Sequence, residues 1–150
     1  MEITEIFGEE KRQYMPLLLL ADESPEMLER YLDRGRMFAL RLGGEAAAEC
    51  VVTDEGGGVL EIKNLAVAPE FQRRGFGRAL IEFLAREFAG EFEALAAGTG
   101  ESPLTVPFYE KCGFAYSHRL KDFFTENYPE PIVEGGVTLR DMLYFRRELG

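Results

Sequence analysis

The chain has 150 residues, of which 46% are hydrophobic, and this length and composition predict one folded domain over residues 1–150. Its 27 acidic and 17 basic side chains give a net charge of −10, which disfavours nucleic acid and anionic membranes as partners. No segment has the length and apolar character of a membrane span or a secretory signal, so we expect a cytoplasmic protein. Two cysteines and one histidine are too few for a disulfide framework or a zinc-type metal cluster.

The first half of the chain predicts a short strand, two helices and three further strands. The helices are expected over residues 10–20 and 24–35, with Ser24 as the cap of the second helix and Gly35 at its end. Short runs of residues that favour β-structure then predict strands over residues 37–42, 46–53 and 59–67. The glycines at 56–58 indicate a hairpin turn rather than a phosphate loop, because a strand follows them and no Lys-Ser or Lys-Thr does.

The second half predicts alternating helices and strands. A helix over residues 75–88 has apolar side chains at three- and four-residue spacing, namely Phe76, Leu80, Phe83, Leu84 and Phe88. After it we expect a strand at 92–98, a helix at 104–111, a strand at 114–120, an ordered loop at 122–136 and a final strand within 137–149. This order predicts a mixed α/β sheet in which the helix after Val67 joins two parallel strands.

The stretch "LAVAPEFQRRGFGRAL", residues 65–80, predicts an anion site. A strand that ends at Val67 and a helix that begins near Gly75 leave the first backbone N–H groups of the helix without partners. Glycines let a ligand approach the backbone, the helix dipole favours an anion, and arginines pair with phosphate. Alternatively, the arginines lie on a solvated turn and a glycine serves close helix packing. The residues concerned are Arg73, Arg74, Gly75, Gly77 and Arg78.

Two motifs resemble those of one enzyme family. "QRRGFG" at residues 72–77 matches the signature Gln/Arg-x-x-Gly-x-Gly/Ala of the GNAT superfamily of acetyl-coenzyme A-dependent N-acetyltransferases. "PFYEKCGF" at residues 107–114 resembles the second signature of that family, and the order of elements agrees over nearly the whole chain. The ending of the chain and "LLLLADES" near its start resemble a little-characterised bacterial branch. The resemblance implies the GNAT fold, a mostly antiparallel central sheet with one parallel, splayed pair of strands and flanking helices.

The resemblance also implies where acetyl-coenzyme A binds. Pantetheine would lie along Leu65, Ala66 and Val67, and the pyrophosphate would bind the backbone amides after Gln72. Those amides belong to Arg73, Arg74, Gly75, Phe76, Gly77 and Arg78. Ser102 stands where the family often has Asn, and its hydroxyl can still hydrogen-bond to the cofactor. No metal is implied.

Tyr109 and Glu61 are the catalytic candidates that the resemblance implies. Tyr109 occupies the position of a phenol that can give a proton to the leaving thiolate. The alternative for Tyr109 is an aromatic that packs between helix and sheet. Glu61 corresponds to a glutamate that deprotonates the amine, commonly through water. The alternative for Glu61 is an ion pair with Lys63 or with a cation on a neighbouring strand. Alternation along the strand predicts one shared face for Glu61, Lys63, Leu65 and Val67.

Two other residues are weaker candidates. His118 is a candidate because histidine commonly serves as a base near neutral pH, although a lone histidine on a strand is more often structural. Cys112 lies near Tyr109 and would permit a ping-pong reaction through an acetyl-thiol, but no His–acid pair is evident beside it.

The acceptor is expected between the early helices and the late loop. That loop offers acids and aromatic rings, which suit a cationic amine of a small molecule or a peptide. Alternatively, its aromatic rings pack against the domain itself and its acids face the solvent. These residues are Asp122, Phe123, Phe124, Glu126, Tyr128 and Glu130.

The predicted function is transfer of an acetyl group from acetyl-coenzyme A to a primary amine by direct attack in a ternary complex. The alternative is a non-catalytic acyl-coenzyme A-binding sensor of the same fold. Dimers are common in the family, and an exposed final strand within 137–149 would allow a homodimer.

Overall fold

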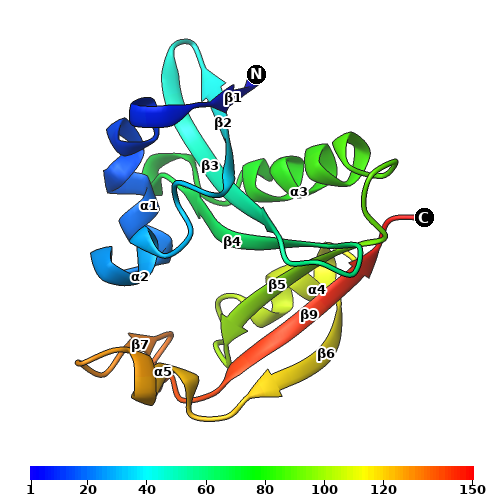
Figure 1. Cartoon of the computed structure of the whole chain (residues 1–150). Helices are drawn as coiled ribbons and strands as arrows, with labels where there is room; N and C mark the ends of the chain where they lie inside the picture. The colour runs from blue at the N-terminus through cyan, green and yellow to red at the C-terminus, as the bar shows by residue number, and fades with distance from the viewer.

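The computed structural model describes residues 1–150 and contains a seven-stranded sheet (Figure 1). Its strand order is β1 (Glu2–Ile6), β2 (Arg36–Leu42), β3 (Glu45–Asp54), β4 (Val59–Val67), β5 (Ala94–Gly100), β9 (Met142–Glu148) and β6 (Ala115–Leu120). Neighbouring strands are antiparallel except β4 and β5, which are parallel. The crossover from β4 to β5 contains α3 (Phe76–Glu87), as a βαβ unit requires. The predicted mixed sheet is therefore confirmed.

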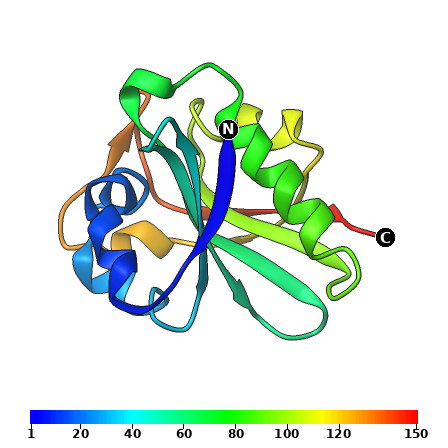
Figure 2. The ribbon, with the colours of Figure 1, turned by 90° about the horizontal axis from the view of Figure 1, so that it is seen from above.

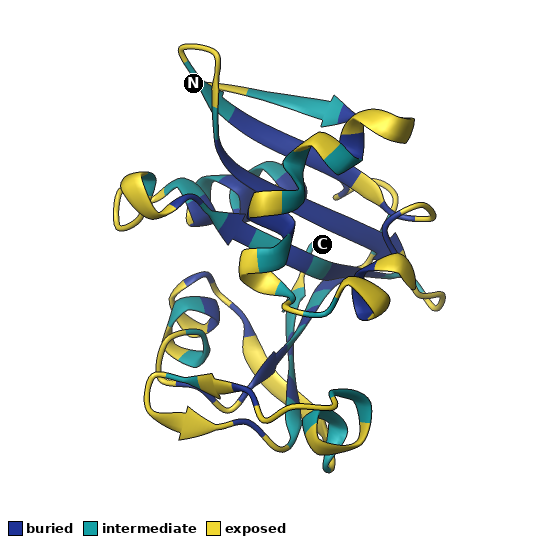
Figure 3. Ribbon diagram, turned by 90° about the vertical axis from the view of Figure 1, so that its left-hand side faces the viewer, coloured by how far each residue is buried: buried dark blue, intermediate teal, exposed yellow.

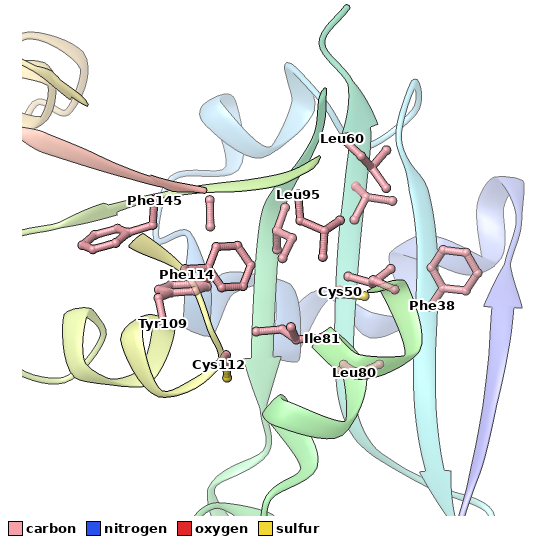
Figure 4. Packing of buried hydrophobic residues seen from close by; sticks show 14 of the residues in the cluster. Phe38, Cys50, Leu60, Leu80, Ile81, Leu95, Tyr109, Cys112, Phe114 and Phe145 are labelled. Atoms are coloured by element: carbon pink, nitrogen blue, oxygen red, sulfur yellow. The ribbon is translucent and has the colours of Figure 1, made fainter. Parts of the chain in front are cut away.

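Helices cover both faces of the sheet. Figure 2 shows α1 (Met15–Ala21) and α2 (Pro25–Glu29) on the opposite side of the strands from α3. The larger core cluster joins α3 and α4 (Val106–Lys111) to the sheet and includes Leu80, Ile81, Tyr109 and Phe145 (Figure 4). A smaller cluster lies under α1 and α2. None of the helices combines the length and apolar character needed to cross a bilayer.

The first predicted helix is divided in two. Residues Gly8–Tyr14 form a 3-10 helix, and α1 begins only at Met15. Pro16 explains the boundary, because proline has no N–H to continue a helical ladder and is best tolerated in the first turn.

The second predicted helix is shorter than expected. Ser24 Oγ accepts the Met27 N–H at 3.2 Å, which confirms the predicted cap. However, α2 ends at Glu29, six residues before Gly35. Gly35 allows close packing, since a Cβ there would lie 2.6 Å from Val51 Cγ1.

The late segment is more regular than the predicted loop. It contains α5 (Phe123–Asn127) and a hairpin of β7 (Val133–Glu134) and β8 (Val137–Thr138). Much of it is exposed, in contrast to the buried central strands (Figure 3). The expectation of an exposed final strand is wrong, because β9 lies between β5 and β6 and the edges of the sheet are β1 and β6.

Candidate active site

The parallel strands β4 and β5 separate after a short paired stretch. Their pairing runs only from Val59 and Ala94 to Ile62 and Ala97, and the strands diverge beyond it (Figure 1). The Ala68 N–H bonds to Ala47 on β3, so alternation along β4 directs the N–H groups of Leu65 and Val67 toward the opening. These unpaired backbone groups are what an extended ligand chain needs in order to pair with the strand.

A cleft of about 240 Å³ lies at this opening. Its walls come from the end of α1, from β4 and β5 beyond their pairing, from α4 and from the late segment. Its charged residues are Asp22, Glu23, Lys63 and Glu134. Its aromatic residues are Tyr109, Phe124 and Tyr128.

Glu61 is placed differently from the prediction, because a β-bulge interrupts β4. Asn64 pairs with Val51 and Ile62 pairs with Val52, so Lys63 is the extra residue and the alternation shifts there. Ile62, Leu65 and Val67 consequently pack on the α3 side, and the predicted shared face of Glu61, Lys63, Leu65 and Val67 does not exist.

The carboxylate of Glu61 has two partners. Glu61 Oε2 lies 3.0 Å from Lys63 Nζ and accepts a hydrogen bond from the Tyr144 hydroxyl at 3.3 Å. Glu61 is 9% exposed and is not among the residues that line the cleft. The ion pair with Lys63 is the arrangement that the sequence offered as the alternative, and the contact from Tyr144 on β9 was not expected.

Tyr109 lies on α4 with its ring among Phe108, Phe114 and Phe145 (Figure 4). It is 8% exposed and lines the cleft, so the predicted packing between helix and sheet is observed, and the position of the side chain is compatible with the predicted catalytic role. Burial raises the pKa of Tyr109 above the ordinary phenol value, and the hydroxyl therefore keeps its proton at neutral pH. A protonated phenol at this position can donate a hydrogen bond or a proton.

The N-terminus of α3 has the features of the predicted anion site. Gly75 precedes the helix with φ 84°, and Arg73 also has a positive φ of 66°. The guanidinium groups of Arg73, Arg74 and Arg78 make no salt bridge within the chain. They remain able to pair with an anion at the free amides of the first turn.

Two signature residues have structural contacts at this site. The Gln72 side chain donates to the Val67 carbonyl at 3.0 Å and thereby ties the loop to the end of β4. A Cβ at Gly77 would lie 3.2 Å from Phe108 Cζ, so this glycine allows α4 to pack against α3. Open space surrounds Gly75, where a ligand can approach the backbone.

Three other candidates lie away from the open cleft. Ser102 is 2% exposed, and its hydroxyl accepts the Leu104 N–H at 3.0 Å in the turn before α4. His118 is exposed on β6 and stacks on the Tyr144 ring. Burial raises the pKa of the Cys112 thiol, which disfavours the thiolate that a ping-pong reaction needs.

The late segment contributes aromatic rings to the cleft, but its predicted acids lie elsewhere. Phe124 and Tyr128 line the cleft, whereas Asp122 lines a separate surface hollow with Arg140. Phe123, Glu126 and Glu130 do not line the cleft either.

Asp22 is a residue of the cleft that the sequence did not single out. Its carboxylate accepts hydrogen bonds from the Tyr128 hydroxyl at 2.9 Å, the Tyr31 hydroxyl at 3.1 Å and the Ser24 N–H at 3.2 Å. These contacts join the α1–α2 connection to the late segment. Asp22 lies within the stretch LLLLADES, but no role was predicted for it, because its partner Tyr128 is 106 residues away in sequence.

The comparisons with known proteins agree with this geometry. Residues 33–116, more than half of the chain, match the family described as "Acetyltransferase (GNAT) domain". The uncharacterized N-acetyltransferase YvbK of Bacillus subtilis (strain 168) is 34% identical over 139 residues, which cover 91% of this chain and 90% of that protein.

Solved structures match over almost the whole chain. A GNAT family acetyltransferase from Elizabethkingia anophelis with acetyl-CoA bound has a TM-score of 0.91 and 34% identity, covering 98% of this chain and 97% of that one. A Bacillus subtilis acetyltransferase in complex with CoA has a TM-score of 0.86 and 32% identity, covering 98% of this chain and 99% of that one. The sequence match and the splayed fold together show that this chain belongs to the GNAT family of acyl-CoA-dependent acetyltransferases.

Proposed function

We propose that residues 1–150 act as one domain that transfers an acetyl group from acetyl-CoA to a primary amine by direct attack. The observation that carries this proposal is the cleft at the divergence of β4 and β5, which Tyr109 on α4 helps to line. The similar structures contain acetyl-CoA or CoA, and this chain has a backbone edge and a helix N-terminus suited to the two parts of that molecule.

The donor would lie across the loop between β4 and α3. Its pyrophosphate would bind the amides of residues 73–78 and the guanidinium groups of Arg73, Arg74 and Arg78. Its pantetheine would pair with the free N–H groups of Leu65 and Val67, with Ala66 between them. Gln72 holds the loop to β4, and the Ser102 hydroxyl shapes the turn before α4.

The reaction would use one acid and one base from opposite sides of the opening. A neutral amine attacks the thioester carbonyl, the C–N bond forms, and the C–S bond breaks. Tyr109 gives its hydroxyl proton to the departing thiolate, and Glu61 accepts the proton of the amine through water. Glu61 does not line the cleft, so a proton transfer from the amine to its carboxylate would run through water.

The experiment follows thiol release from acetyl-CoA with a panel of polyamines, amino acids, aminoglycosides and basic peptides. We expect amine-dependent release by the wild type. We expect it to fall about a hundredfold or more in Tyr109→Phe, the lower range for loss of a general acid. Calorimetry on the same variant is expected to show unchanged acetyl-CoA binding. Cofactor binding without turnover for any acceptor would favour the sensor, and absence of binding would overturn the proposed cofactor site.

A further inference from the structure

The cleft has an excess of negative charge. Three carboxylates line it, and Lys63 is its only basic side chain. Lys63 is already 3.0 Å from Glu61, which does not line the cleft, so Lys63 does not offset the other acids. A cavity lined in this way attracts a cation.

Glu134 is the carboxylate of the cleft that comes from the late segment. It belongs to the β7–β8 hairpin, where Gly135 packs against Pro103 in the turn before α4. Glu134 and Tyr109 line the same cleft. Burial is the main cause of the raised pKa of that phenol, and the charge of Glu134 adds to it. It makes neither a salt bridge nor a side-chain hydrogen bond within the chain, so its carboxylate is free to bind a ligand.

Asn64 also lines the cleft, where it donates from Nδ2 to the Leu18 carbonyl at 3.0 Å and to the Tyr31 hydroxyl at 3.1 Å. Its Oδ1 is buried and does not face a ligand. A primary ammonium has three N–H donors and no acceptor, which complements the unpaired carboxylate of Glu134.

We propose that Glu134 determines acceptor specificity by binding the ammonium group of a cationic aliphatic amine beside Tyr109. This inference rests on the proposed acetyltransferase function and adds the residue that selects the acceptor. The role differs from that of Glu61, because Glu134 contacts the acceptor before its deprotonation whereas Glu61 receives the proton through water.

The test compares the steady-state kinetics of the wild type, Glu134→Gln and Glu134→Asp with 1,4-diaminobutane and a lysine-containing peptide as acceptors. Loss of one charge-assisted hydrogen bond is expected to raise the KM of the amine in Glu134→Gln about tenfold to a hundredfold. The kcat and the KM for acetyl-CoA should change little. Glu134→Asp keeps the charge and is expected to recover most of the affinity. The matched control is Glu130→Gln, which removes an exposed acid of the same segment outside the cleft.

The outcomes separate this inference from the proposed function. A wild type that acetylates these amines while Glu134→Gln keeps the same amine KM overturns the role of Glu134 alone. A wild type that acetylates arylamines, which are neutral at pH 7.5, in preference to these ammonium compounds also overturns it. A wild type that binds acetyl-CoA and acetylates no amine overturns the proposed function, and with it this inference.

Discussion

The Tyr144 hydroxyl donates a hydrogen bond to Glu61 Oε2 at 3.3 Å and so links β9 to β4 across the intervening strand β5. Gly98 on β5 makes the crossing possible, because a Cβ there would lie 3.0 Å from Tyr144 Cζ. The Tyr144 ring is also stacked on His118, with ring centroids 4.7 Å apart. Side chains from β9 and β6 therefore help to fix the carboxylate that we propose as the base.

Tyr144→Phe tests this support of Glu61. The substitution keeps the stacked ring and removes only the hydroxyl, so we expect kcat to fall about threefold to tenfold, the effect of one hydrogen bond. The KM for acetyl-CoA should stay unchanged in steady-state kinetics, because Tyr144 does not contact the proposed cofactor site. Tyr116→Phe on the exposed strand β6 is the control. An unchanged kcat in Tyr144→Phe would show that Glu61 acts without this contact.

The unpaired arginines at α3 lead to a prediction about the donor. The double variant Arg74→Gln/Arg78→Gln is expected to weaken acetyl-CoA binding about tenfold or more, because two charge-assisted contacts to the pyrophosphate are lost. Acetyl-pantetheine has no pyrophosphate, and calorimetry should show equal affinity for it in the wild type and the variant. An equal loss of affinity for acetyl-CoA and acetyl-pantetheine would contradict the assignment of these arginines to the phosphates. Arg86→Gln, on the last turn of α3, is the control.

The strands and α3 were predictable because their signals are local. Alternation of apolar residues marks a strand, and spacing of three and four residues marks the buried face of α3. The signature at residues 72–77 also located the free helix N-terminus. These features depend on neighbours in sequence, so tertiary contacts did not have to be known.

The features that were missed depend on distant partners. The bulge at Lys63 arises from the register between β3 and β4, and a shift of one residue moved Glu61 to the other face. The insertion of β9 between β5 and β6 is likewise non-local. Glu134 lies in a segment rich in proline and glycine without a motif, and only the folded hairpin brings it near Tyr109.

The contact between Tyr128 and Asp22 predicts a link between the late segment and the acceptor site. Tyr128→Phe removes the 2.9 Å hydrogen bond and leaves the ring in the wall of the cleft. We expect the KM of the amine to rise about twofold to tenfold, since one hydrogen bond that holds two walls together is lost. Steady-state kinetics and hydrogen exchange of residues 122–136 measure the effect. Unchanged exchange and an unchanged amine KM would mean that packing alone positions this segment.

Glu49 predicts an unusual dependence of stability on pH. It is fully buried on β3, both carboxylate oxygens lack hydrogen-bond partners, and burial raises its pKa well above the ordinary value. The unfolded chain loses this proton above the ordinary glutamate pKa of about 4.3, whereas the folded chain keeps it. Between the two pKa values the folded state binds more protons, so the Glu49 contribution to stability is full at low pH and is lost as the pH rises.

Glu49→Gln replaces the protonated acid with a neutral group of nearly the same shape that has no proton to lose. Asn64 Oδ1, on the same face and diagonal to Glu49 across β3 and β4, offers an acceptor to the new amide. Urea unfolding measures the free energy of unfolding from pH 5 to pH 8. Relative to the wild type, this free energy should rise in the variant by up to about 1.4 kcal/mol for each pH unit. Glu45→Gln, exposed on the same strand, should show no such trend. A difference between Glu49→Gln and the wild type that is the same at pH 5 and pH 8 would mean that Glu49 titrates normally in the folded protein.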